Sequence, residues 1–93
     1  MSRKGYSKIY EANSFYQHAL AQCIERGTNE QEVTEAIRNG NHKPAKQGRL
    51  EYRYDFQFDR EWQGRSYAIK RVAPIIVENA IEIVVITVYT FYF

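Results

Sequence analysis

A few side chains in this sequence have the chemistry that an enzyme needs. Imidazole side chains titrate near neutral pH, so a histidine such as His18 is a candidate general acid or base. Thr87 and Tyr89 are two positions apart, which places both hydroxyls on one face of a strand. The structural alternatives are a solvated histidine on a helix and, for Thr87, a good strand former whose hydroxyl needs a partner if buried. No glycine-rich phosphate loop, nucleophile elbow or metal-ligand spacing accompanies these residues.

Cations are concentrated in the middle of the sequence. Four of them stand against one acidic residue, Glu51, in the region 42–53, which is a local charge of about +3. Tyr52 and Tyr54 alternate with the end of this region, and cations beside aromatic rings suit the phosphates and unstacked bases of RNA. The alternative is that the lysines keep a loop solvated and the tyrosines belong to the core. Lys70 is a further candidate for RNA contact by its charge and position. The candidate RNA-binding cations of the region are Lys43, Lys46 and Arg49.

Length and composition limit the class of protein. The chain has 93 residues, enough for one domain, and its net charge of +2 is too small for an architectural nucleic-acid coat. Eight Tyr, five Phe and one Trp favour a fold that contains a sheet. One cysteine, Cys23, and two histidines cannot build an internal disulfide or an ordinary zinc site. We therefore expect no metal, no cofactor and a reducing, cytoplasmic location.

We expect no targeting segment and no membrane partner. Residues 1–15 are polar and basic and lack the apolar core of a signal peptide. The apolar run 81–93 is too short to cross a bilayer and contains Glu82. These features predict a soluble protein.

Two helices are predicted in the first half of the chain. Over residues 14–26 the apolar residues follow a helical period, and His18 lies about 170° around the helix from their centre, so we expect it to be solvated. Gly27 ends this helix. Thr28 has capping-box spacing at the start of the second helix, and Gly40 stands where a left-handed C-terminal cap is expected. The predicted buried stripe of the first helix consists of Tyr16, Ala19, Leu20, Cys23 and Ile24.

Strand-like patterns fill the second half of the chain. Residues 41–48 resemble a basic linker, and from Leu50 apolar and polar residues alternate as far as Phe58, as in a strand with one buried face. A turn at Gln63–Gly64 leads into an extended segment over 65–77, in which Pro74 indicates a bend or an edge position.

The last part of the chain completes the predicted fold. After a turn at 78–80, the run 81–92 is apolar on both faces, which predicts a central strand. We therefore predict an α+β fold, with two N-terminal helices packed on a three- to four-stranded antiparallel sheet. Residues 1–93 form a single domain in this prediction, with residues 1–12 as a flexible N-terminal arm.

Several short sequence matches point to a known family. The chain has His-Ala at 18–19, Glu-Arg-Gly at 25–27, a predicted helix ending in Asn-Gly at 39–40, and Ile-Thr-Val-Tyr at 86–89. This pattern resembles a family of small, uncharacterised bacterial domains. That family is placed with the barnase, EndoU, colicin and RelE-like (BECR) ribonuclease fold of toxin nucleases. The resemblance covers residues 14–90 and implies the same fold for this chain.

The resemblance also implies an activity and a set of site residues. The activity is metal-independent RNA cleavage, in which the ribose 2′-hydroxyl attacks the adjacent phosphorus. His18 matches the family's histidine and is the implied base or acid. Arg26 matches the arginine before glycine, which binds phosphate or caps the helix end, while Thr87 and Tyr89 match hydroxyls that orient the phosphate or donate a proton. Many relatives carry an arginine at the position of Gln22, and an amide cannot neutralise a phosphate.

The resulting hypothesis is an endoribonuclease of the toxin type, alone or paired with an antitoxin protein. The alternative is a non-catalytic module of the same fold that binds RNA or a protein. A further expectation concerns the aromatic terminus, Phe91, Tyr92 and Phe93, because two short helices cannot cover all three rings. We expect the C-terminal strand to contribute to a homodimer.

Overall fold

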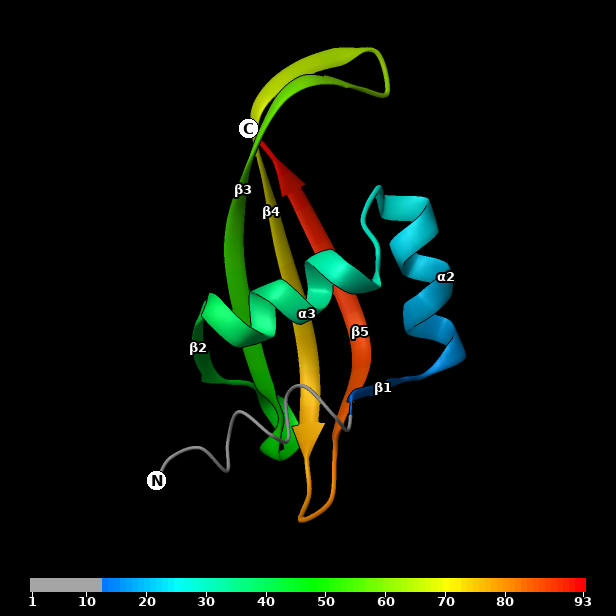
Figure 1. Ribbon diagram of the computed structural model, residues 1–93, viewed down its shortest axis with the longest axis vertical. Coiled ribbons are helices and arrows are strands. Elements are labelled where there is room, and N and C mark those ends of the chain that lie inside the picture. The colour runs from blue at the N-terminus through cyan, green and yellow to red at the C-terminus, as the bar shows by residue number, and fades with distance from the viewer. Residues whose placement is uncertain (1–12) are drawn as a thin grey trace.

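The protein has an α+β fold (Figure 1). Its computed structural model describes residues 13–93, and the arm predicted over residues 1–12 lies outside them. Within residues 13–93, neither helix has the length and apolar character required to cross a membrane. The elements in chain order are β1 (Asn13–Phe15), α2 (Gln17–Arg26), α3 (Glu30–Asn39), β2 (Asn41–Pro44), the short 3-10 helix η1 (Lys46–Gly48), β3 (Leu50–Trp62), β4 (Arg65–Glu78) and β5 (Ile83–Tyr92).

The strands form one mixed sheet. Its five strands are ordered β1-β5-β4-β3-β2. β1 runs parallel to β5, and the other neighbouring pairs are antiparallel. The prediction of three or four antiparallel strands was therefore wrong in both number and type. The two strands that were missed have weak sequence signals: β1 is three residues long, and β2 is exposed throughout, inside the region predicted as a linker.

Helix α2 packs along the edge of β5. It begins at Gln17 rather than at residue 14, because the residues before it pair with β5. It ends before Gly27, as predicted, and this glycine has a left-handed φ of 79°. The predicted buried stripe is only partly correct, since Tyr16 is 55% exposed and Ile24 is 82% exposed. Gln22 is buried instead, because the helix faces a strand edge as well as the core.

Helix α3 differs from prediction at both ends. Asn29, not Thr28, is its N-cap, and the Asn29 side chain accepts a hydrogen bond from the Glu32 N–H at 2.8 Å. The Thr28 hydroxyl donates to the Glu32 carboxylate instead, at 2.8 Å. Gly40 has a φ of −82°, so the predicted left-handed cap is wrong. Glycine is needed there for space, because a Cβ would collide with the backbone of Ala36 and of β3.

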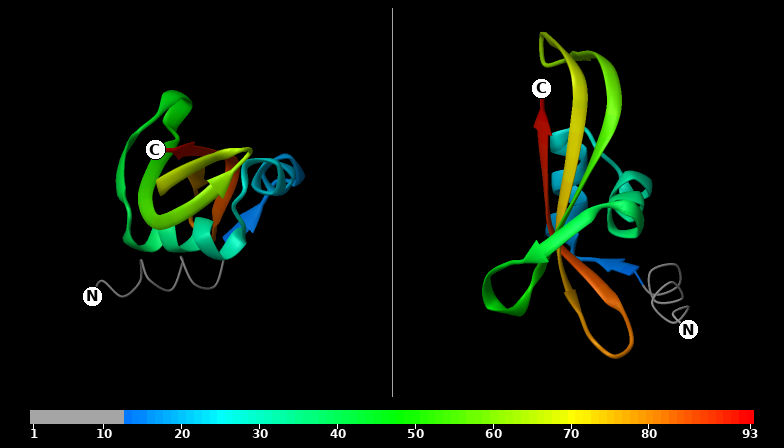
Figure 2. Two further views of the ribbon diagram at one scale, coloured as in Figure 1. Left: turned by 90° about the horizontal axis from the view of Figure 1, so that it is seen from above. Right: turned by 90° about the vertical axis from the view of Figure 1, so that its left-hand side faces the viewer.

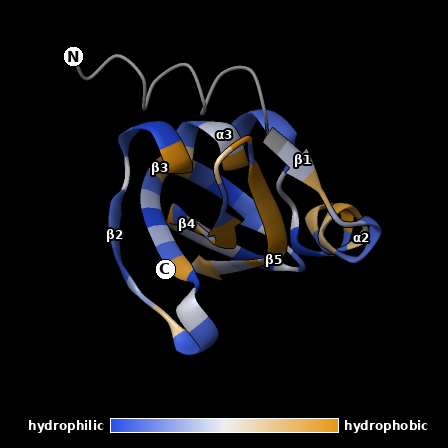
Figure 3. Cartoon of the chain, turned by 90° about the horizontal axis from the view of Figure 1, so that it is seen from below, coloured by the Kyte–Doolittle hydropathy of each residue, from blue (hydrophilic) through white to orange (hydrophobic). Residues whose placement is uncertain are grey.

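α3 packs on one face of the sheet and α2 lies at its β5 edge, so neither of these two helices covers the other face (Figure 2). The strongly hydrophobic residues of β4 and β5 lie in the middle of the fold (Figure 3). The alternation predicted from Leu50 is confirmed, because Leu50, Tyr52, Tyr54 and Phe56 pack against the core on the helix-covered face. The core itself consists of Ala19, Cys23, Val33, Ala36, Ile37, Val72, Ile76, Ile83, Val85 and Val88.

Two irregularities shape the middle of the sheet. Pro74 is buried inside β4, opposite Val88, and a β-bulge follows directly, between Ile75 and Ile76. The proline therefore accompanies a local distortion and does not mark a sheet edge. β1 pairs only with the first residues of β5, as far as Val85. The predicted central position of the last strand thus holds only for its beginning, and the rest of β5 has β4 on one side alone.

Candidate functional site

Helix α2 takes the place of a neighbouring strand where β1 stops. The side-chain oxygen of Gln22 accepts a hydrogen bond from the Val88 N–H at 2.8 Å. The Arg26 guanidinium donates to the Val88 carbonyl oxygen at 2.7 Å. These two side chains, one helical turn apart, satisfy both backbone groups of a buried residue that would otherwise lack partners. We call this contact between α2 and the edge of β5 the α2–β5 seam.

The seam continues at the C-terminal end of α2. The Arg26 carbonyl oxygen accepts hydrogen bonds from the Thr90 hydroxyl at 3.0 Å and from the Tyr92 hydroxyl at 2.6 Å. The Tyr92 ring stacks on Trp62 with centroids 5.1 Å apart, and burial raises the pKa of the Tyr92 hydroxyl. A Cβ at Gly27 would collide with both of these aromatic side chains, so the helix can end this close to them only at a glycine.

His18 lies at the exposed start of the same helical line. It precedes Gln22 by four residues and Arg26 by eight, so all three share one face of α2, with His18 on the order of 12 Å along the axis from Arg26. The prediction that His18 is solvated is confirmed. The face bearing His18 points to the edge of β5, because Gln22 and Arg26 contact Val88.

Three exposed aromatic rings, two on β5 and one on the residue that follows it, lie on the face that α2 and α3 leave open. Tyr89, Phe91 and Phe93 are 45%, 45% and 52% exposed. They alternate with Thr90 and Tyr92, which bond to α2 on the covered face, so they share the opposite, open face. Thr87 lies on the open face as well, half-buried opposite Ile75.

Each of these rings has a guanidinium over it. Arg26 lies 5.3 Å from the centroid of Tyr89, Arg53 lies 6.0 Å from that of Phe91, and Arg71 lies 5.0 Å from that of Phe93. Arg53 bonds to Glu51 at 2.6 Å, and Arg71 bonds to Asp55 through two hydrogen bonds of 2.7 and 3.1 Å. The open face therefore presents alternating rings and cations, which we call the aromatic–arginine face. Its members are Arg26, Arg53, Arg71, Tyr89, Phe91 and Phe93.

The predicted RNA-binding lysines fall in different environments. Lys43 is exposed on β2 opposite Glu51, beside the aromatic–arginine face. Lys46 is exposed in η1, and Arg49 is half-buried just after it. Lys70 is only 4% exposed, and its ammonium lies 2.7 Å from the Glu32 carboxylate and 2.8 Å from a carbonyl oxygen at the end of α2. It points to the helix-covered face, opposite to that of Arg71.

Other chemistry is poorly supported by the described residues. Cys23 is 3% exposed, and burial raises the pKa of its thiol, which disfavours the nucleophilic thiolate. Within residues 13–93, no group of three or more His, Cys, Asp or Glu side chains is placed to hold a metal ion.

The structure brings together some of the predicted site residues. Arg26 touches Tyr89, and Thr87 shares the face of Tyr89. His18 lies on the same face of α2 as Arg26 but on the order of 12 Å away along the helix axis. The sheet separates Lys70 from Thr87 and Tyr89, whereas its ammonium bonds to the Gly27 carbonyl oxygen, next to Arg26. The sequence interpretation missed Phe91, Phe93 and two arginines as site residues. The sequence signal for Phe91 and Phe93 was present, because aromatic residues at alternate positions of a strand share one face. These two residues were assigned only to a dimer contact. No known protein family, curated protein or solved structure matches the chain.

Proposed function

We propose that the aromatic–arginine face binds single-stranded RNA. The observation that supports this most directly is the row of three exposed rings on β5 and the residue after it, each with a guanidinium over it. Unpaired bases stack on exposed aromatic and guanidinium planes, and base–aromatic stacking contributes about 1–3 kcal/mol per base. The arginines also supply the positive charge that phosphates need.

The geometry favours binding with little loss of side-chain freedom. Arg53 and Arg71 are already held by carboxylates of β3, so their guanidiniums are ordered before a ligand arrives. The same carboxylates offset much of the positive charge of these two arginines. Base stacking, rather than phosphate contact, should then be the main source of affinity. We therefore expect a modest salt dependence compared with proteins that bind mainly through phosphates.

The test is a binding titration with a fluorescently labelled, unstructured RNA. Phe91→Ala should weaken binding by roughly 5- to 150-fold, the range that one lost stacking contact corresponds to. Tyr16→Ala is the matched control, because Tyr16 is also an exposed ring but is the N-cap of α2 and does not belong to the aromatic–arginine face. Equal affinities for both variants and the unchanged protein would contradict the proposal and favour the protein-binding alternative.

A second candidate function is RNA cleavage of the toxin type, with attack by the ribose 2′-hydroxyl. The observation that favours it is the contact of Arg26 with Tyr89, since Arg26 shares one face of α2 with His18. One N–H of the Arg26 guanidinium donates to the Val88 carbonyl oxygen. A guanidinium has five N–H donors, so the remaining ones can bind a phosphate. In this proposal His18 transfers a proton, Tyr89 protonates the leaving oxygen, and Thr87 orients the phosphate.

Cleavage is tested by incubating the protein with RNA in EDTA and analysing the fragment ends. The proposal requires fragments with 2′,3′-cyclic phosphate ends, and metal-independent chemistry requires that EDTA does not prevent them. His18→Ala should lower the single-turnover rate by roughly 10²-fold or more while RNA affinity hardly changes. A rate that is unchanged in His18→Ala would remove His18 from the mechanism.

A cytoplasmic location and an antitoxin partner belong to the same proposal. The single cysteine, which is buried and unpaired, suits a reducing compartment. A neighbouring gene for a small acidic protein would supply a partner complementary to the aromatic–arginine face. Co-expression with that protein should then reduce RNA binding.

A further inference from the structure

The outer edge of β3 is unpaired over part of its length. β2 pairs with β3 only as far as Arg53, and within residues 13–93 no other strand lies along that edge. The free part begins at Tyr54 and runs to an irregularity between Gln57 and Arg60. An exposed sheet edge is a template for another strand.

The hydrogen-bond ladder shows which backbone groups face outward there. Ile69 of β4 exchanges two backbone hydrogen bonds with the C-terminal residue beyond β5, at 2.7 and 3.0 Å, so its neighbour Lys70 faces β3. Phe56 is opposite Lys70 and therefore directs its backbone groups toward β4. Asp55 and Gln57, on either side of Phe56, then direct their N–H and carbonyl groups away from the sheet. A strand added at this edge would find four unpaired backbone groups.

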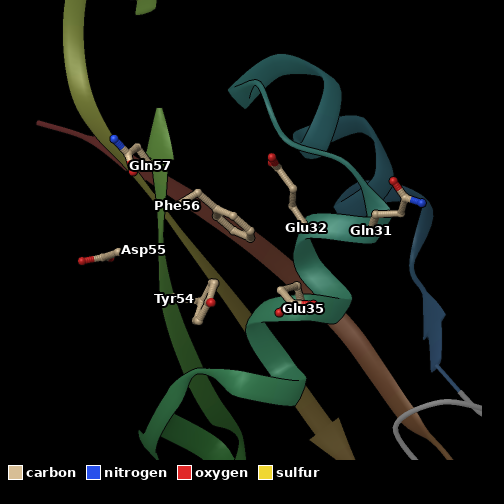
Figure 4. A pocket seen from close by; sticks show the side chains of 7 residues that line it. All are labelled: Gln31, Glu32, Glu35, Tyr54, Asp55, Phe56 and Gln57. Carbon is tan, nitrogen blue, oxygen red and sulfur yellow. The ribbon is translucent and has the colours of Figure 1, made fainter. Parts of the chain in front are cut away.

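Two adjoining grooves follow this edge. The first has a volume of about 380 Å³ and lies between α3 and β3 (Figure 4). Tyr54 and Phe56 point into it from β3, and Glu32 and Glu35 extend toward it from α3 (Figure 4). The second has a volume of about 450 Å³ and continues past Asp55 to the start of β2. Tyr54 and Asp55 line both, so the two grooves meet at this edge, and we call them together the β3 edge groove.

The first part of the β3 edge groove is lined by acidic side chains although the protein has a net charge of +2. Three carboxylates and no lysine or arginine line its first part, and the second part adds two arginines that are already bonded to carboxylates of β3. Glu32 bonds to Lys70, and Asp55 accepts two hydrogen bonds from Arg71. Glu35 accepts a hydrogen bond from the Asn39 amide and is approached by Arg38 at 3.8 Å. A carboxylate can accept several hydrogen bonds, so Glu35 and Asp55 can each take a further cation.

We propose that the β3 edge groove binds an extended segment of a partner protein that carries Lys or Arg at alternate positions. Its backbone would pair with Asp55 and Gln57, adding a strand to the sheet. Its cationic side chains would reach Glu35 and the rings of Tyr54 and Phe56, where cation–π contact adds to ion pairing. A second copy of this chain fits poorly, because its own edge would bring Glu35 and Asp55 against like charges.

Amide hydrogen exchange of the full chain tests this directly. The probe is a peptide of about ten residues with alternating Lys and Val, and the matched control replaces each Lys with Glu. At saturation the Lys peptide should slow exchange of the Asp55 and Gln57 amides by about tenfold or more. The Phe56 amide already pairs with β4 and should change little. Absence of protection by the Lys peptide at low salt, or equal protection by the Glu peptide, would overturn the proposal.

Two charge variants test the role of the groove. Glu35→Lys should weaken binding of the Lys peptide by roughly 2- to 10-fold, and Glu61→Lys, the same change in the exposed β3–β4 hairpin, should not. Equal effects of both would show that the overall charge is responsible. Protection of Asp55 and Gln57 without peptide that rises with protein concentration would show that a second copy is the occupant. Tyr89→Ala should leave peptide binding unchanged, because its ring contacts Arg26 and neither arginine of the groove, and this separates the edge from the proposed RNA face.

Discussion

The Arg26 guanidinium lies 2.7 Å from the Val88 carbonyl oxygen and 5.3 Å from the centroid of the Tyr89 ring, the next residue along β5. One side chain therefore both closes a strand edge and contributes to the exposed face. A substitution of Arg26 would change stability and ligand binding together. Tyr89 separates the two roles, because Tyr89→Phe removes a hydroxyl while it keeps the ring under the guanidinium.

Gln22→Arg should destabilise the protein. Arginine has no acceptor atom, so the buried Val88 N–H would lose its partner, at a cost of about 1–3 kcal/mol in the free energy of unfolding. Urea denaturation measures this cost, and Gln22→Glu is the control because it keeps an acceptor oxygen. The BECR resemblance predicts the additional effect that Gln22→Arg raises RNA cleavage. A variant as stable as the unchanged protein would show that the Gln22 contact with β5 contributes little.

Lys70→Met should lower the free energy of unfolding by about 3 kcal/mol, because Glu32 would keep a poorly solvated charge without its partner. We place the effect at the lower end of the range for buried pairs since the Glu32 side chain is 24% exposed. Lys46→Met, at an exposed position, is the control and should leave stability unchanged. RNA titration of the folded Lys70→Met variant then decides its predicted RNA contact: a weakened affinity would support that contact, and an unchanged one would leave Lys70 a purely structural role.

Acid should weaken the contact between β3 and β4 through Asp55. Hydrogen bonds from Arg71 lower the pKa of this carboxyl below its ordinary value of 3.8. A lowered folded-state pKa means that the stabilisation is complete well above pH 3.8 and is lost as the pH falls through the folded-state pKa. Asp55→Asn should therefore reduce stability at neutral pH and converge with the unchanged protein in strong acid. The effect is small because the Asp55 side chain is 42% exposed, and parallel pH profiles would contradict it.

The basic segment offers a test of phosphate contact. Replacing Lys43, Lys46 and Arg49 with Gln should weaken RNA binding and reduce the salt slope by about 0.7 for each lost contact. The three can be changed singly, since Lys43 lies beside the aromatic–arginine face and the other two lie farther along the chain in and after η1. A reduced slope for Lys43→Gln alone would place the RNA strand across β2. Unchanged salt slopes for all three variants would show that these side chains are solvated and do not contact RNA phosphates.

Self-association through the C-terminal strand should compete with RNA. Phe91 and Phe93 remain about half exposed, whereas Tyr92 is covered by aromatic side chains on the other face. A homodimer that buries the two exposed rings gains roughly 1.5–3 kcal/mol for each. Sedimentation equilibrium should then show dimers that dissociate when RNA is added. A monomer at high micromolar concentration, unaffected by removal of the final residues, would reject the dimer.

The fold was predictable where periodicity is strong. The alternation after Leu50, the turn at Gln63–Gly64 and the end of α2 at Gly27 are local signals, and each is confirmed. β1 and β2 could not be found in this way, because short exposed strands form through partners distant in sequence. Gly40 shows the same limit. Its position suggested a left-handed helix cap, but glycine is needed there because the backbone at this residue lies close to the backbone of β3.

The candidate site was predictable only in part. His18, Arg26 and Tyr89 were selected from the sequence, yet the packing of α2 against a strand edge, which brings Arg26 over Tyr89, has no local signature. Lys70 was selected as a free cation, and its burial follows from the α2–α3 turn folding over β4. Which face of a strand stays open is decided by where the helices pack, so the face of Phe91 and Phe93 required the tertiary structure.

The seam between α2 and β5 also bears on aggregation. Residues 83–92 are rich in β-branched and aromatic residues and contain no charge and no proline, which is the composition of segments that stack into amyloid-like sheets. In the folded protein, Gln22 and Arg26 occupy the hydrogen-bonding groups of this strand where β1 no longer shields it. Helix α2 therefore blocks this strand edge from pairing with another chain. Because α2 precedes β5 in the sequence, it is synthesised before the strand that it covers.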